Sequence, residues 1–259
     1  MTAHRPILTS VQDTLFAIFG VVSICVVWEL VHWAQIVEPA LLPSVRDIFG
    51  ALAKLIAGGN ILPDLGMTLF RSLSGFSIAV LIGVPMGICM GMFPAVHRCV
   101  LPLVDFFRSV PVTTLYPIFV LTLGVRDKSK IGMVAAGCIF VVMLNSAYGV
   151  VQSRPIRRQM ANLYGCSGFN LMRWIIFREA LPQTLIGMRI ALSLALIVSV
   201  LGEMFMGCEH GLGQRLTDAY TTFSVDRMYA LVIITGLLGF VLNRMFVRFE
   251  KALVPWTAT

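Results

Sequence analysis

Five charged side chains lie within or at the edges of long apolar stretches, where residue type alone indicates a special role. They are Glu29, Asp105, Arg108, Arg189 and Glu203. A charge in the hydrocarbon of a bilayer costs at least about 2.5 kcal/mol unless it faces a water-filled cavity or an opposite charge. We therefore expect each of these residues to pair with another charge or to contact a polar solute.

Arg108 stands out because it lies between Pro102 and Pro111. Proline removes a backbone donor and breaks a helix, so this stretch predicts an interrupted helix with exposed backbone groups. Two interpretations of Arg108 stay open. It is a fixed cation on the path of an anionic solute, with Pro111, Asp105 and Glu203 as further pathway candidates, or it forms a structural ion pair with Asp105 or Glu203.

Two of the other charges have simpler interpretations. Glu29 stands next to Trp28, a residue type that favours membrane boundaries, so we interpret Glu29 as a local pairing or interface residue. Arg189 lies near the expected cytoplasmic end of its helix, where a long side chain reaches the membrane surface. Neither needs a role in solute binding.

The whole chain is too apolar for a soluble protein. Of its 259 residues, 58% are hydrophobic and 13% charged, and the mean hydropathy is +0.86. Lipid must be the solvent, and long apolar runs favour helices over a closed barrel, which needs short alternating segments. The runs long enough to span a bilayer number about six: 14–34, 72–93, 99–125, 131–151, 183–206 and 228–247.

These runs predict an all-α membrane protein with a single transmembrane domain, residues 14–259, after a short cytoplasmic N-terminus, residues 1–13. Near residue 44, a Leu-Pro-Ser cap precedes apolar residues at helical spacing, which predicts an amphipathic helix at the membrane surface. Glycines at positions 83, 87 and 91 recur every four residues and predict a helix face that packs closely against another helix.

The formal net charge of +7 comes from basic residues that are scattered or flank apolar runs. Nucleic-acid binding would need a basic face with interleaved aromatics, so no nucleic-acid partner is expected. The loop 152–182 is richest in arginine, and the positive-inside rule places it in the cytoplasm together with both termini. The basic segment 126–130 is the exception, because the same topology assigns it to the outside.

The loop 152–182 is too long for a simple connector and too apolar to be fully solvated. Residues 159–164 predict a short helix that Gly165 terminates, and Ser167 predicts the cap of a second helix over residues 169–177. Two short helices with a glycine bend make a compact knob that must pack against something. A hairpin lying on anionic lipid remains the alternative.

This loop resembles the cytoplasmic loop of binding-protein-dependent ATP-binding cassette (ABC) transporter permeases, which carries a Glu-Ala-Ala motif, a glycine and an Ile-x-Leu-Pro ending. The matching positions are Gln159, Met160, Ala161, Gly165 and Ile175. Ala161, Gly165 and Ile175 fit the motif, whereas its Glu, one Ala and the Leu-Pro are replaced.

Further stretches resemble the branch of that family that imports nitrate, taurine, aliphatic sulfonates, bicarbonate and some vitamin precursors. The likeness covers nearly the whole chain. It rests on Leu41 to Ser44, Gly83 to Gly87, Phe107 to Pro111, Gly124-Val125 with Ser129-Lys130, Ala180 to Pro182, Gly187 to Leu192, Glu203-Met204, Gly211 to Gly213 and Pro255-Trp256.

The resemblance implies the type I, MetI-like permease fold, with its core at about residues 66–248, in a bacterial cytoplasmic membrane. It implies a permease that moves a small solute. Arg108 favours an anion as that solute, such as taurine or another sulfonate, nitrate or a carboxylate. The resemblance also implies three kinds of protein partner: separate ABC ATPase subunits on the loop 152–182, a second permease copy, and an extracytoplasmic solute-binding protein.

No ATP site is expected in this chain. The phosphate-binding sequence G-x-x-x-x-G-K-[ST] does not occur, so ATP and Mg²⁺ belong to the partner subunit and the chain itself is neither an enzyme nor a cofactor protein. One rival is a secondary transporter driven by an ion gradient, which would want internal repeats and an embedded ion site. Another is an intramembrane enzyme, but no metal or nucleophile motif stands in an apolar run.

Overall fold

The computed structural model describes residues 8–59, 61–152 and 175–255, and the regular elements in these ranges are helices. In chain order they are α1 (Leu8–Trp33), α2 (Val45–Ala57), α3 (Ile61–Met92), α4 (Pro94–Ser109), the 3₁₀ helix η1 (Val112–Leu115), α5 (Tyr116–Leu123), α6 (Asp127–Val151), α9 (Phe177–Met206), α10 (Leu212–Thr221) and α11 (Val225–Leu253). They divide into two compact units, residues 1–59 with 218–234, and residues 60–217 with 235–259.

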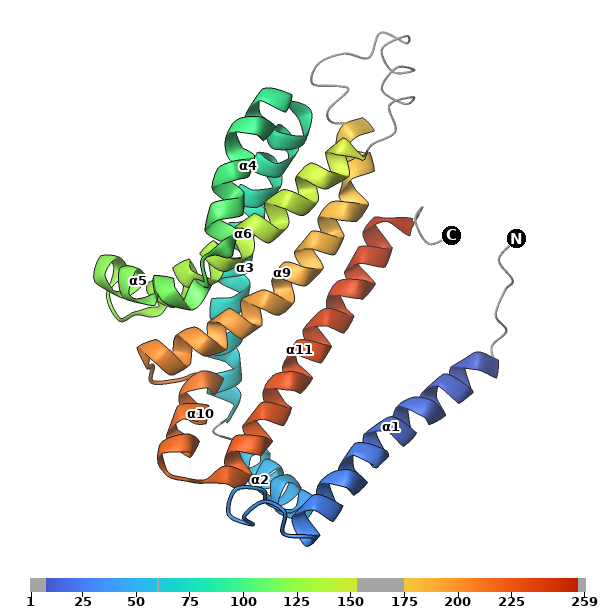
Figure 1. Ribbon diagram of the computed structural model, residues 1–259, viewed down its shortest axis with the longest axis vertical. Coiled ribbons are helices and arrows are strands. Elements are labelled where there is room, and N and C mark those ends of the chain that lie inside the picture. The colour runs from blue at the N-terminus through green and yellow to red at the C-terminus, as the bar shows by residue number, and fades with distance from the viewer. Residues whose placement is uncertain (1–7, 60, 153–174, 256–259) are drawn as a thin grey trace. The chain divides into compact units, whose positions relative to one another are not determined.

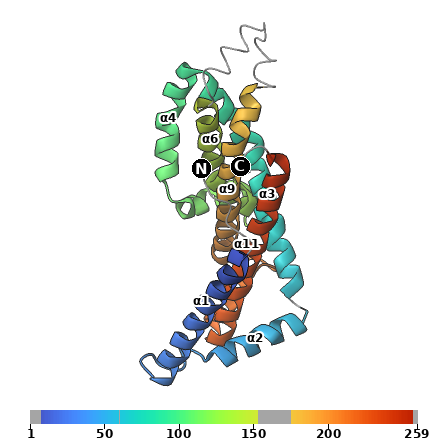
Figure 2. The ribbon, with the colours of Figure 1, turned by 90° about the vertical axis from the view of Figure 1, so that its right-hand side faces the viewer.

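Helices α3, α6 and α9 form the centre of the second unit and lie side by side (Figure 1), as the rotated view also shows (Figure 2). Glycines let α3 and α6 approach closely. A Cβ at Gly75 would lie 2.5 Å from the Val134 Cβ, and one at Gly91 would lie 2.6 Å from the Val150 Cβ. The predicted glycine face is therefore confirmed as a packing face, and it extends back to Gly75.

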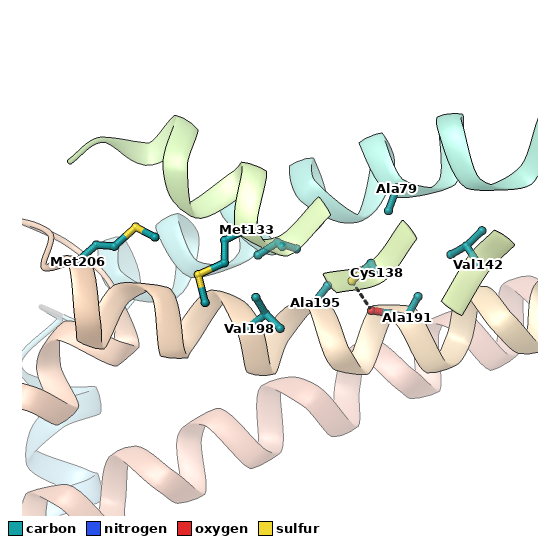
Figure 3. Close-up of a cluster of buried hydrophobic side chains, with 9 residues drawn as sticks. Ala79, Met133, Cys138, Val142, Ala191, Ala195, Val198 and Met206 are labelled. Atoms are coloured by element: carbon teal, nitrogen blue, oxygen red, sulfur yellow. Dashed lines mark hydrogen bonds between the residues drawn. The ribbon is translucent and has the colours of Figure 1, made fainter. Parts of the chain in front are cut away.

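The core between these helices is built from small and flexible side chains. Figure 3 shows Met133, Cys138 and Val142 of α6 facing Ala191, Ala195 and Val198 of α9, with Ala79 of α3 nearby. The Cys138 thiol donates to the Ala191 carbonyl at 3.2 Å. Close packing of these side chains stabilises the contact between the helices through van der Waals interactions, which drive helix association in a membrane.

The predicted interruption near Pro111 is confirmed. Helix α4 ends at Ser109, η1 begins after Pro111, and the pair of helical stretches 94–109 and 112–123 bends by 89°. Pro111 has no N–H to donate to the preceding turn, so the helix cannot continue through it. The expected span 99–125 is thus either a broken span or a re-entrant segment.

Four helices in the described residues are long and apolar enough to cross a membrane: α3, α6, α9 and α11. The bent pair makes a fifth if it counts as one span. The first expected span, 14–34, lies in α1, a helix of 26 residues. The six expected runs therefore lie in α1, α3, the bent pair, α6, α9 and α11.

The first unit joins α1, α2 and the turn between α10 and α11. Ser44 caps α2 as predicted, because its hydroxyl accepts from the Asp47 N–H at 3.2 Å. The Glu29 Oε2 accepts from the Val45 N–H at 3.0 Å, which confirms local pairing for Glu29. Trp28 packs edge-on against Tyr229 with ring centroids 5.1 Å apart.

Candidate functional site

Arg71 is the centre of a buried charge cluster in the second unit. It lies on α3 and is 2% exposed. Its Nη1 donates to the Glu203 Oε1 at 2.7 Å and to the His210 carbonyl at 2.8 Å, while its Nε donates to the Asp127 Oδ1 at 2.7 Å. One guanidinium therefore links α3, the first turn of α6 and the end of α9, using the fixed fork of donors that arginine provides.

Glu203 is fully buried, and both of its carboxylate oxygens are occupied. Beyond the bond to Arg71, its Oε2 accepts from the Thr68 hydroxyl at 3.0 Å and from the Gly213 N–H at 2.9 Å. Burying a carboxylate is energetically tolerable only when its oxygens accept hydrogen bonds and an ion pair in this way. Glu203 is therefore a fixed structural anion in this conformation, with its acceptors already taken.

Asp64 ties the segment after α9 to the first turn of α3. Its Oδ1 accepts from the Gly211 N–H at 2.9 Å, and its Oδ2 accepts from the Arg215 Nε at 2.7 Å. The Leu212 N–H donates to the Thr68 hydroxyl at 3.0 Å. Residues 207–213, which we call the return turn, are thus held onto α3 by both charges and backbone donors.

The local sequence explains the tight path of the return turn. Gly207 ends α9 with φ +68, a left-handed conformation that favours glycine. A Cβ at Gly213 would overlap the Val200 carbonyl and come within 2.7 Å of the Glu203 Cβ. Only a residue without a side chain lets the Gly213 N–H reach the Glu203 carboxylate.

Lys130 of α6 is the sixth charged member of the cluster and is 2% exposed. Its stem packs on Gly202, with Cγ 3.8 Å from the position a Cβ would take there. The charge cluster comprises Asp64, Arg71, Asp127, Lys130, Glu203 and Arg215. Three acidic and three basic side chains balance, so the cluster carries no formal net charge.

Sequence reasoning found only Glu203 of this cluster. Arg71 stands immediately before the expected span 72–93, and Asp127 falls in the expected outer loop. A usable signal was present: Asp64, Thr68 and Arg71 recur at i, i+4 and i+7, which places them on one helix face.

The other pathway candidates lie at the bend rather than in the cluster. The Arg108 Nε is 3.1 Å from the Asp105 Oδ1, one helical turn away on α4. Their side chains are 57% and 48% exposed, so the pair faces outward from this chain. Pro111 follows at the bend itself. The structure brings Asp105, Arg108 and Pro111 together and places Glu203 with Arg71 instead.

Arg189 lies apart from both sites. Its Nη1 is 3.5 Å from the Glu250 Oε2 of α11, and its side chain is 38% exposed. This ion pair joins α9 to α11 within the second unit. The partial exposure fits the expectation that Arg189 reaches toward a surface.

Four of the five motif positions in the loop 152–182, namely Gln159, Met160, Ala161 and Gly165, lie outside the described residues. Ile175 is described and leads directly into α9. Next to it, Ile176 is 3% exposed and packs with Val150 of α6 and Ala180 of α9. The two ends of the loop are therefore anchored to each other by apolar contacts.

Residues 79–255 match the family model of the binding-protein-dependent transport system inner membrane component. The taurine transport system permease protein TauC of Escherichia coli is 28% identical over 236 residues, covering 89% of this chain and 85% of TauC. A putative aliphatic sulfonates transport permease protein, SsuC of Bacillus subtilis, is 28% identical over 240 residues, covering 90% and 84%.

Solved structures give the same fold. The MetNI methionine ABC transporter in an inward-facing conformation aligns with a TM-score of 0.66 and 18% identity, covering 76% of this chain and 97% of that one. An amino acid ABC transporter aligns with a TM-score of 0.61 and 17% identity, covering 78% and 96%. The MetI-like helical fold, the apolar helices and the family match agree. The chain belongs to the family of binding-protein-dependent transport system inner membrane components, as a permease subunit of an ABC importer.

Proposed function

We propose that this permease imports a small organic anion, with taurine or another aliphatic sulfonate as the first candidate. The observation that carries the proposal is the similarity to the taurine and aliphatic sulfonate permeases, which extends over about nine tenths of this chain. The exposed guanidinium of Arg108 supports it, because a sulfonate carries three negatively charged acceptor oxygens to which arginine donates charge-assisted hydrogen bonds. Asp105 and Pro111 complete the proposed pathway surface at the bend.

The energy source in this proposal is a separate ATPase subunit. Residues 159–175 of the loop 152–182 would bind it, with Gln159, Met160, Ala161, Gly165 and Ile175 at the contact. Support comes from the packing of the loop ends. Val150 of α6 and Ile176, which precedes α9, belong to one buried cluster, so a displacement of the loop would move both helices. A second permease copy and an extracytoplasmic solute-binding protein complete the transporter, as the family description names a binding protein.

Growth on single sulfur sources tests the solute class. We expect a deletion strain to lose growth on taurine or an alkanesulfonate at micromolar supply while it keeps growth on sulfate. Plasmid-borne wild-type gene should restore growth. Unchanged growth of the deletion strain on every sulfonate tried would contradict the proposed substrate class.

Reconstitution separates the ATP-driven importer from the rival that uses an ion gradient. Permease and ATPase subunits in proteoliposomes should accumulate labelled solute when ATP is present on the ATPase side and binding protein on the other. Ionophores that collapse ion gradients should not reduce this uptake. Uptake that persists without ATP and stops with ionophores would overturn the proposal.

A further inference from the structure

The first unit carries a polar groove between α2 and the turn that joins α10 to α11. Its volume is about 600 Å³. The lining residues are Ala40, Pro43, Arg46, Asp47, Gly50, Ala51, Lys54, Phe223, Val225 and Asp226. Nothing in the transport pathway or in the contact with the ATPase accounts for this groove.

Charges of both signs line the groove. Arg46 and Lys54 lie about two turns apart on exposed positions of α2, and Asp226, in the first turn of α11, also lines the groove. Within the described residues, none of these three makes an ion pair. A lipid headgroup surface in bacteria is anionic and would select basic residues alone. Mixed charges that are not satisfied within the chain are typical of a protein interface, where a partner supplies the counter-charges.

Phe223 stands at the rim of the groove and is 81% exposed. Its backbone is left-handed, with φ +51, which a bulky residue rarely adopts. The turn around it is held firmly: the Thr222 hydroxyl donates to the Asp218 carbonyl at 2.8 Å, and the Ser224 N–H donates to the Ala219 carbonyl at 2.9 Å. Aromatic side chains, phenylalanine among them, are enriched at protein interfaces.

The sequence assigns this groove to the outer side of the membrane. The far end of α11 carries Arg244, Arg248 and Lys251, which the positive-inside rule places in the cytoplasm. The end that starts at Val225 then faces outward. A soluble partner on that side meets the groove without crossing lipid.

We propose that this groove is the docking site for the solute-binding protein, with Phe223 as the apolar anchor and Arg46, Lys54 and Asp226 as its charged rim. The inference rests on the proposed function, since it assumes a binding-protein-dependent importer. The partner surface should offer an apolar pocket for one aromatic ring, flanked by acidic groups opposite Arg46 and Lys54 and by a basic group opposite Asp226.

The test measures binding of the purified cognate solute-binding protein to the intact permease–ATPase complex in nanodiscs. Phe223→Asn keeps a residue that tolerates left-handed backbone but removes the ring, and we expect it to raise the Kd at least about tenfold. Arg46→Glu should do the same. Phe223→Tyr should bind like the wild type, because it retains the ring.

Matched controls lie close by. Arg227→Glu makes the same charge reversal as Arg46→Glu, but Arg227 does not line the groove although it is next to Asp226. It should alter the Kd by less than about fivefold. Phe19→Ala removes an aromatic of α1 that is 71% exposed, and should leave binding unchanged. If Phe223→Asn and Arg46→Glu bind as tightly as these controls, the docking inference is wrong while the importer function stands.

Photo-crosslinking identifies the occupant directly. The photoreactive substitution Phe223→p-benzoylphenylalanine in the same nanodiscs should form a covalent product with the binding protein. Crosslinks to lipid or to a second permease copy instead would overturn the inference. Wild-type complex that shows no binding of the binding protein at all would overturn both the inference and the proposed function.

Discussion

Arg71 and Glu203 form an ion pair of 2.7 Å between α3 and α9, and their side chains are only 3% and 0% exposed. Removing Arg71 leaves the Glu203 carboxylate buried without its ion-pair partner, and removing Glu203 leaves Arg71 with Asp127 alone. Breaking a buried ion pair in this way costs about 3–5 kcal/mol. We therefore expect Glu203→Leu or Arg71→Met to lower the melting temperature of the detergent-solubilised permease strongly. Fluorescence-detected size exclusion after heating measures this.

The double variant Arg71→Met with Glu203→Leu should lose less stability than the sum of the two single changes, because residues in one ion-pair network couple. Asp105→Asn is the comparison, since its exposed pair with Arg108 contributes only about 0–1 kcal/mol. Equal effects of Glu203→Leu and Asp105→Asn would show that the charge cluster does not hold these helices together.

A methyl group at Gly75 should weaken the packing of α3 on α6. Gly75→Ala places a Cβ 2.5 Å from Val134 and 2.8 Å from the Ile131 carbonyl, so the helices must move apart. Overpacking of this kind costs about 1–3 kcal/mol. Gly66→Ala on the same helix meets no atom within 4 Å and should be neutral or slightly stabilising. The melting temperatures of the two variants test this prediction. A Gly75→Ala variant as stable as Gly66→Ala would contradict the close approach of α3 and α6.

Arg108→Ala should reduce uptake of an anionic solute while the protein folds normally. The reason is that the Arg108 side chain is 57% exposed and its pair with Asp105 adds little stability. Initial uptake rates with labelled taurine should show a higher KM. Arg98→Ala, an exposed arginine on the same helix away from the bend, should transport like the wild type. Normal uptake by Arg108→Ala removes the support for an anion.

Cys208 should react slowly with thiol reagents at neutral pH. Burial raises the pKa of the Cys208 thiol, and the Arg71 guanidinium, whose Nη1 is 3.6 Å from the Sγ, only partly opposes this. A raised pKa means that a smaller fraction of the thiol is present as reactive thiolate at a given pH. Alkylation of Cys208 should therefore accelerate at a higher pH than alkylation of a solvent-exposed cysteine does. Mass spectrometry of peptides after N-ethylmaleimide at several pH values measures it, with denatured protein as the control. Equal rates in folded and denatured protein would refute the prediction.

Local features were predictable from the sequence because each depends on neighbours within a turn or two. The Ser44 cap and the break at Pro111 follow from residue type and position. The glycine repeat indicated close helix packing, although it could not name α6 as the partner. Helix starts were less accurate: α3 begins at Ile61, about a dozen positions before the expected run, because Asp64 and Arg71 lower the local hydropathy.

The charge cluster was largely beyond sequence reasoning because its partners are far apart along the chain. Arg71 pairs with Glu203 across 132 positions and with Asp127 across 56. A single sequence contains no signal for such pairs, so the sequence offered Arg108 as a partner of Glu203. The polar stripe on the first turns of α3 could have shown that a partner was needed, but not which one.

The separation between Arg71 and Glu203 also matters for how the protein is made. The ribosome adds about 5–20 residues per second, so the glutamate is synthesised roughly 7–26 s after the arginine. Until then, Arg71 of the newly synthesised α3 lacks the Glu203 carboxylate that neutralises it in the folded protein. Asp127, 56 positions after Arg71, is synthesised earlier and can pair with it first. α3 can therefore take its final place only after α9 has been translated.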